Sequence, residues 1–131
     1  MTTTMTLGID LGDKTSHWCL LDAAGVVVHR DRVRSRPVDF RALFARFAAA
    51  ENKPVVVIEA GGQSRWVDEL GKQAGLTMIV ASPKHVRLIY GGTTKTDKFD
   101  AEALARLARV DTKLLHPVTT AASERRRTWR W

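Results

Sequence analysis

Cysteine is nearly absent from this chain of 131 residues, in which Cys19 is the single example. One thiol can form neither an internal disulfide nor a thiolate zinc cluster, and no Cys-x-x-Cys pair occurs. Long apolar runs are absent too, since no stretch approaches the roughly 18 residues of a membrane span, and Met1–Thr6 lacks the basic start of a signal peptide. We therefore expect a soluble, cytoplasmic protein without a membrane partner.

Acidic residues are outnumbered, with 14 Asp and Glu against 21 Lys and Arg, which gives a formal net charge of +7. A basic excess in a chain of single-domain size favours a polyanionic partner, nucleic acid before anionic membrane. The excess is concentrated near the C-terminus, because Arg106–Trp131 holds seven basic and two acidic residues and so contributes five of the seven net charges.

The first half of the chain predicts three antiparallel strands and a helix. Leu7–Leu11, Ser16–Leu21 and Val26–Val33 have the alternation of strands, with a turn at Asp22–Gly25 between the second and third. The apolar spacing after Pro37 predicts an amphipathic helix that ends near Ala50.

The second half alternates strands with helices. Pro54–Ile58 is a β-branched run typical of a buried parallel strand, Ser64–Ala74 follows as a helix, and Leu76–Val80 is a further strand. A last helix is expected from near Asp97, with an apolar face made by Leu104, Leu107 and Ala108. The order β-β-β-α-β-α-β-α predicts an α/β fold, a mixed five-stranded sheet flanked by helices, which is the RNase H-like order.

Two acidic residues end predicted strands that such a sheet makes neighbours. Asp10 ends the first strand, and Glu59 ends the buried fourth strand. Neighbouring strands lie roughly 4.8 Å apart, so both carboxylates can face one site if the strand ends are in register. Gly8 and Gly12, which flank Asp10, are expected to leave room for a phosphate group.

Asp97 and Asp100 offer a second acidic pair. Their i, i+3 spacing places both on one face of a helix start, with Cβ atoms roughly 5 to 6 Å apart. Two carboxylates about 4 Å apart disfavour joint ionisation by roughly 4 kcal/mol at an effective dielectric constant near 20. A divalent metal relieves that repulsion, and two-metal nucleases use oxygen ligands of this kind. The four acids predict a site for Mg²⁺ or Mn²⁺, with two ions, that cleaves or transfers phosphodiester bonds.

Taken singly, most of these acids have ordinary structural explanations. Asp97 could be a helix N-cap residue. Asp100 could be an acid of the first helical turn, where the helix dipole favours negative charge, and Asp10 could belong to a turn. Glu59 is harder to explain in this way, because an acid at the end of a buried strand lies where open α/β sheets place their sites. The metal-site prediction therefore depends on the four residues together.

Basic side chains near these acids are candidates for contacts with phosphate groups, although exposed lysines and arginines are as often plain solvated surface. The candidate nucleic-acid contacts are Lys84, Arg87, Lys95, Lys98, Arg125, Arg126 and Arg127.

Four segments resemble the transposases of the insertion sequence 110 family and the related pilin-gene invertases. They are Gly8–Lys14 with Trp18, Val57–Ala60, Ser82–Val86, and Lys95–Ala101 with Leu104 and Ala105. The resemblance implies that Asp10, Glu59, Asp97 and Asp100 are the DEDD metal ligands of an N-terminal RuvC-like catalytic domain. Residues 1–115 would form this domain, and residues 116–131 would begin a basic helical connector that is cut short.

The same resemblance implies DNA transposition and recombination guided by a structured RNA from the element, and hence DNA and RNA partners at the bacterial nucleoid. A homodimer or higher oligomer is expected. In the family a further domain carries a serine nucleophile, so the 131 residues alone are expected to lack part of the reaction machinery.

Three alternatives remain open. A Holliday-junction resolvase of related fold would also suit the length, although Lys95–Ala101 argues against it. An actin-like ATPase or sugar-kinase fragment would explain Gly8–Gly12 as a phosphate loop, but the second glycine-rich loop that it needs is missing. A non-catalytic module for dimerisation and nucleic-acid docking would explain the basic charge without any chemistry.

Overall fold

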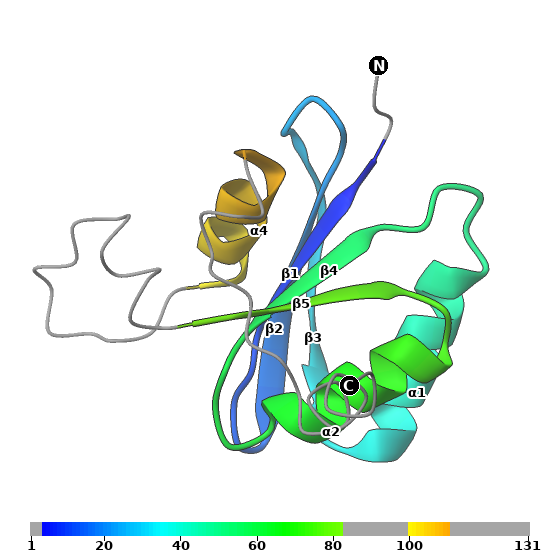
Figure 1. Ribbon diagram of the computed structural model, residues 1–131, viewed down its shortest axis with the longest axis vertical. Coiled ribbons are helices and arrows are strands. Elements are labelled where there is room, and N and C mark those ends of the chain that lie inside the picture. The colour runs from blue at the N-terminus through cyan, green and yellow to red at the C-terminus, as the bar shows by residue number, and fades with distance from the viewer. Residues whose placement is uncertain (1–3, 83–99, 111–131) are drawn as a thin grey trace, which may run out of the picture.

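The structure, a computed structural model, describes residues 4–82 and 100–110 (Figure 1). A five-stranded sheet has the strand order β3-β2-β1-β4-β5. β2 is antiparallel to both β1 and β3, whereas β1, β4 and β5 run parallel. The predicted mixed five-stranded α/β sheet is thereby confirmed. The elements are β1 (Thr6–Asp10), β2 (Thr15–Leu21), β3 (Val27–Arg34), α1 (Pro37–Ala48), β4 (Val55–Glu59), α2 (Ser64–Gln73), β5 (Thr77–Ala81) and α4 (Ala101–Val110).

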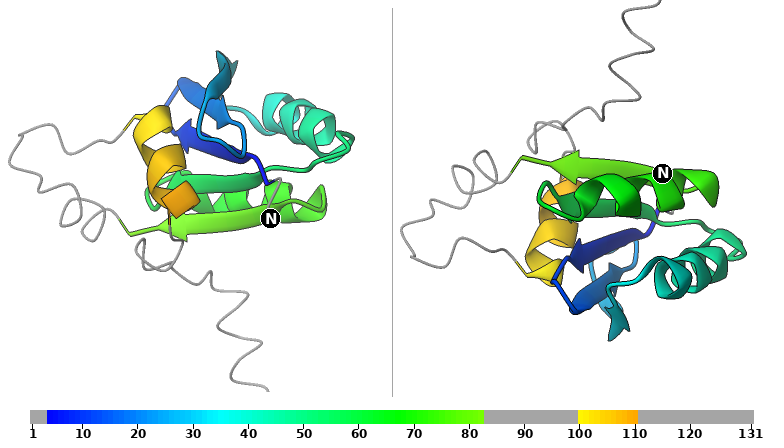
Figure 2. Two further views of the ribbon diagram at one scale, coloured as in Figure 1. Left: turned by 90° about the horizontal axis from the view of Figure 1, so that it is seen from above. Right: turned by 90° about the horizontal axis from the view of Figure 1, so that it is seen from below.

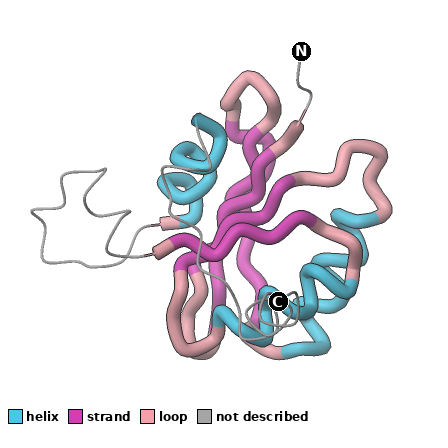
Figure 3. Tube along the Cα trace, in the orientation of Figure 1, coloured by secondary structure: helices cyan, strands magenta, loops and turns pink. Residues whose placement is uncertain are grey.

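Helices cover both faces of the sheet (Figure 3). The main core lies against α1 and α2, and α4 packs on the other face, as the views from above and below also show (Figure 2). Among the helices of the described residues, none has the length and apolar character needed to cross a membrane. The fully buried side chains of the main core are Leu7, Ile9, Phe40, Phe44, Val56, Ile58 and Val67.

The β2–β3 hairpin turns where the sequence predicts it. The Asp22 carboxylate accepts hydrogen bonds from the backbone N–H groups of Ala24 and Val26, both at 2.9 Å. Gly25 has a φ of +87°, a left-handed conformation that favours glycine. These local contacts fix the hairpin, and with it the register of β2 against β3.

Gly8 lets α4 approach the backbone of β1. Gly8 is buried, and a Cβ built on it would overlap the carbonyl oxygen of Ala101 and lie 2.8 Å from the amide nitrogen of Ala105. The expectation that Gly8 leaves room for a phosphate group is therefore wrong, because the space is filled by the helix. Leu104, Leu107 and Ala108 make the buried face of α4, as predicted.

Candidate functional site

Asp10 and Glu59 lie beside each other at the carboxyl ends of two parallel strands. The register pairs Gly8 with Val57 and Ile9 with Ile58, so the next residues along the two strands are Asp10 and Glu59. Side chains alternate along a strand, which puts both acids on the face of Gly8 and Val57, the face that α4 covers. The structure thus brings two of the four predicted acids together.

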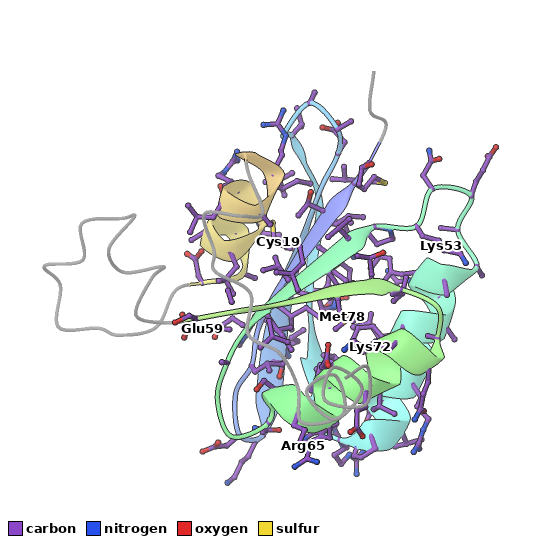
Figure 4. All side chains as sticks on the ribbon, viewed as in Figure 1. Cys19, Lys53, Glu59, Arg65, Lys72 and Met78 are labelled. Atoms are coloured by element: carbon purple, nitrogen blue, oxygen red, sulfur yellow. The ribbon has the colours of Figure 1, made fainter. Side chains whose placement is uncertain are left out.

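Both acids line a cleft of about 120 Å³. One wall is the β4–α2 loop, in which a Cβ on Gly61 or Gly62 would meet nothing within 4 Å. The Oε2 atom of Glu59 is buried, so one carboxylate oxygen lies away from solvent. The cleft therefore has two half-buried carboxylates on one side and open space beside Gly61 and Gly62 on the other. Figure 4 shows Glu59 well away from Arg65 and Lys72, the labelled residues of α2.

The loop after β1 is held by hydrogen bonds that converge on Gly12. Its carbonyl oxygen accepts from the Gln63 side-chain amide at 2.5 Å and from the Ser35 hydroxyl at 2.6 Å. Its N–H donates to the Ser16 hydroxyl at 3.2 Å, and the Ser16 and Ser35 hydroxyls are 2.8 Å apart. Because Gln63 precedes α2 and Ser35 follows β3, the loop beside Asp10 is tied to both neighbouring elements.

Asp100 stands immediately before α4. Its Oδ1 accepts a hydrogen bond from the N–H of Ala103 at 2.8 Å, and its carbonyl accepts from Leu104 at 3.1 Å, which is N-cap geometry. The sequence predicts that the helix begins near Asp97 with Asp100 in its first turn, but α4 begins at Ala101 and Asp100 is its N-cap residue. Asp97 lies outside the described residues.

The contacts of α4 determine where Asp100 lies. Glu102 forms ion pairs with Arg30 of β3 and with Arg106, the latter at 2.7 Å. Hydrogen bonds from Arg106 and Arg30 lower the pKa of Glu102. Arg106 and Arg109 also donate to the hairpin carbonyls of Gly25 and Ala23, at 3.2 and 3.0 Å. These bonds fasten the helix to the β2–β3 hairpin and so fix its N-terminus.

The side chains that could hold a divalent cation are few among the described residues. In the part of the chain that the structure describes, no group of three or more His, Cys, Asp or Glu side chains could hold a metal ion. Mg²⁺ commonly binds one or two protein carboxylates and completes its shell with water and phosphate oxygens. The Asp10–Glu59 pair at the cleft fits that requirement, and any third protein ligand has to come from elsewhere.

Two residues near the cleft carry no distinguishing pattern in the sequence. His17 is the cross-strand partner of Asp10 in the β1–β2 pair and is exposed, and Asp13 lines the cleft from the β1–β2 loop. Only the hairpin register places His17 next to Asp10, and a short loop between strands is a weak signal in sequence. The candidate nucleic-acid contacts Lys84, Arg87, Lys95, Lys98, Arg125, Arg126 and Arg127 all lie outside the described residues.

Comparison with known proteins gives a family and a fold. Residues 7–127 match the family model described as Transposase, the DEDD family of insertion sequence 110. No curated protein matches the sequence. Among solved structures, the chain is similar to T. thermophilus RuvC in complex with Holliday junction substrate, with a TM-score of 0.53 and 15% identity over 78% of this chain and 90% of that chain. This likeness shows a RuvC-like, RNase H-like fold, as predicted.

Two further structures resemble the chain less closely. A second structure of Thermus thermophilus RuvC has a TM-score of 0.49 at 14% identity, over 90% of this chain and 85% of that one. An inorganic polyphosphate/ATP-glucomannokinase from Arthrobacter sp. has a TM-score of 0.45 at 17% identity, over 71% of this chain and 51% of that one.

Proposed function

Because this chain belongs to the DEDD transposase family of insertion sequence 110, we propose that it supplies the metal-dependent site at which a transposase cleaves and transfers DNA strands. The observation that carries the proposal is the placement of Asp10 and Glu59, which end adjacent parallel strands, share one face of the sheet and line one cleft. Ligand sites of open α/β sheets lie at this end of the strands.

Asp10 and Glu59 would hold Mg²⁺ or Mn²⁺, and Asp97 and Asp100 would complete a site for two ions. Bound metal would supply Lewis-acid stabilisation of the charge that develops on the phosphate oxygens. Since Oδ1 of Asp100 caps α4, Oδ2 is the oxygen that would face the cation. The contacts of Glu102 and Arg109 with the hairpin would hold Asp100 in position.

The remaining cleft residues have positioning roles in this proposal. The hydrogen bonds to Gly12 would keep the β1–β2 loop, and hence Asp10, in one place while a substrate binds. The open rim at Gly61 and Gly62 would admit the phosphate backbone. Glu59, with one oxygen already shielded from water, would bind metal with less loss of hydration than an exposed acid.

The family membership also supports the larger assembly that we propose for this chain. Residues 1–115 would be the catalytic domain, and residues 116–131 would begin a basic connector. A structured RNA would guide the domain to DNA in the bacterial nucleoid, and two or more copies would act together.

Metal titration tests the proposal directly. In isothermal calorimetry of the 131-residue chain with Mg²⁺ and with Mn²⁺, we expect binding that Asp10→Asn and Glu59→Gln each weaken at least tenfold. Glu51→Gln is the matched control, because it removes one exposed negative charge from the α1–β4 loop. Equal metal binding by Asp10→Asn and Glu51→Gln would contradict the proposal, and tight binding of ATP would favour the ATPase alternative instead.

A non-catalytic docking module is the second candidate. It is favoured by the finding that three metal-ligating side chains do not come together within residues 4–82 and 100–110. A docking module would bind DNA in the presence of EDTA and would give no metal-dependent heat. The proposed nuclease would nick supercoiled DNA in Mg²⁺ or Mn²⁺ and lose that activity in Glu59→Gln.

A further inference from the structure

Strand β3 carries three arginines at alternate positions on one face of the sheet. Arg30, Arg32 and Arg34 pair across to Cys19, His17 and Thr15 of β2. Cys19 packs against Ala101 and Ala105 of α4, so the alternation puts all three arginines on the α4 face.

The strand separates its charges by face. Asp31 is the single acid of β3 and pairs with Trp18, whose side chain belongs to the main core on the other face. The Nε2 atom of His29 lies 3.8 Å from the Asp31 carboxylate on that side. The charged side chains that β3 places on the α4 face are therefore all basic.

Arg32 is level with the candidate metal site. The register of β1, β2 and β3 places Asp10, His17 and Arg32 in one row across the sheet. Two strand spacings of roughly 4.8 Å separate the backbones of Asp10 and Arg32 by about 10 Å. Arg34 lies on the same face of β3 two residues farther along the strand, so it is past the level of Asp10.

Helix α4 covers only part of this face. It lies over Gly8 and Cys19, and Arg30 at that level is neutralised by its ion pair with Glu102. Past the start of the helix His17, Arg32 and Arg34 are exposed. Among the residues that the structure describes, neither Arg32 nor Arg34 forms an ion pair.

The edge of the sheet leaves these two arginines accessible from the side as well. β3 is an outer strand, and Arg32 and Arg34 stand at the rim of a groove of about 410 Å³ that opens on the α1 face, where Asp31 and Asp39 also line it. Consecutive alternate side chains lie roughly 6.8 Å apart along a strand, so the two guanidinium groups can hold separate phosphates. A guanidinium group matches a phosphate through paired hydrogen bonds.

We propose that Arg32 and Arg34, with His17 beside them, bind the backbone phosphates of the DNA whose scissile bond enters the Asp10–Glu59 cleft. The choice of DNA rests on the proposed function. These contacts offset the electrostatic repulsion between the acidic cleft and the polyanionic DNA. Because they are made to phosphate groups, they do not depend on the base sequence. The Arg32–Arg34 surface thereby sets the path of the strand that leaves the metal site.

The salt dependence of DNA binding tests the inference. Fluorescence anisotropy with a labelled DNA duplex, over a series of salt concentrations in EDTA, gives the slope of log affinity against log salt. Each lost phosphate contact lowers that slope by roughly 0.9, so we expect Arg32→Gln/Arg34→Gln to lower it by about 2. Its affinity at low salt should fall at least tenfold.

The matched control is Arg41→Gln/Arg65→Gln. Arg41 and Arg65 are exposed on α1 and α2, on the opposite face of the sheet, and Figure 4 shows Arg65 on the outer side of α2. This variant removes the same charge and should keep the slope of the unchanged chain. Thermal melting of both variants checks that they fold.

Three results would overturn the inference. The first is an equal slope in the two double variants. The second is a loss confined to an RNA duplex of the same sequence, which would make RNA the occupant. The third is self-association of Arg32→Gln/Arg34→Gln in light scattering with unchanged DNA binding, since charged side chains also protect sheet edges from pairing. Failure of the proposed function is seen separately, as metal binding that Asp10→Asn leaves unchanged.

Discussion

At the scale of single residues, two glycines close to the site have opposite environments. Gly8 lies under α4, where a side chain has no room, whereas Gly61 borders the cleft and has open space around its Cα. Neither residue has a positive φ, so backbone strain does not distinguish them. The pair allows the steric cost of one methyl group under α4 to be measured directly.

Gly8→Ala is expected to lower stability by about 1 to 3 kcal/mol, because the new methyl group collides with the backbone at Ala101 and Ala105. Gly61→Ala should change stability by less than about 0.5 kcal/mol, as is usual for substitutions away from packed features. Urea unfolding followed by circular dichroism measures both. Equal midpoints for the two variants would show that α4 does not press on β1.

At the scale of elements, most strands and helices could be predicted from local patterns. The turn at Asp22–Gly25 and the aromatic face of α1 are set by neighbours in sequence, and both are found where predicted. The start of α4 and the contact of Gly8 depend on tertiary packing, which a local pattern does not encode. Arg32 and Arg34 alternate visibly in the sequence, yet their place on the same sheet face as Asp10, two strands away, follows only from the register of two hairpins.

The attachment of α4 to β3 should depend on pH through Glu102. Hydrogen bonds from Arg106 and Arg30 hold the pKa of Glu102 below its ordinary value of 4.5. Because the folded state has the lower pKa, this stabilisation is complete above the ordinary value and is lost as the pH falls through the folded-state value. We expect Glu102→Gln to lose less stability than the unchanged chain between pH 6 and pH 3.

Urea midpoints at several pH values would measure this difference. Glu69→Gln serves as control, since Glu69 is an exposed acid of α2 on the other face of the sheet. Carboxylates other than Glu102 also affect stability in this pH range. The difference between the pH profiles of the variants is therefore the quantity that reports on Glu102. If both variants follow the pH profile of the unchanged chain, the ion pairs of Glu102 do not contribute to the loss of stability at low pH.

At the scale of the whole molecule, the candidate site exists only when segments far apart in sequence are assembled. β1 supplies Asp10 and β4 supplies Glu59, and the two acids line one cleft only because these strands pair in parallel. The unfolded chain does not hold these groups together and so has no such site. A ligand that binds only the folded state raises its stability by mass action.

Divalent metal should therefore raise the melting temperature of the whole chain. At a metal concentration 100 times the dissociation constant, the stabilisation is about 2.7 kcal/mol, which corresponds to a rise of about 10 °C for a chain of this size. Glu51→Gln should show the same rise, whereas Asp10→Asn/Glu59→Gln should show little, and KCl at equal ionic strength controls for screening. A rise of equal size in Asp10→Asn/Glu59→Gln would place the metal elsewhere, because the paired carboxylates that define the cleft would then be unnecessary for binding.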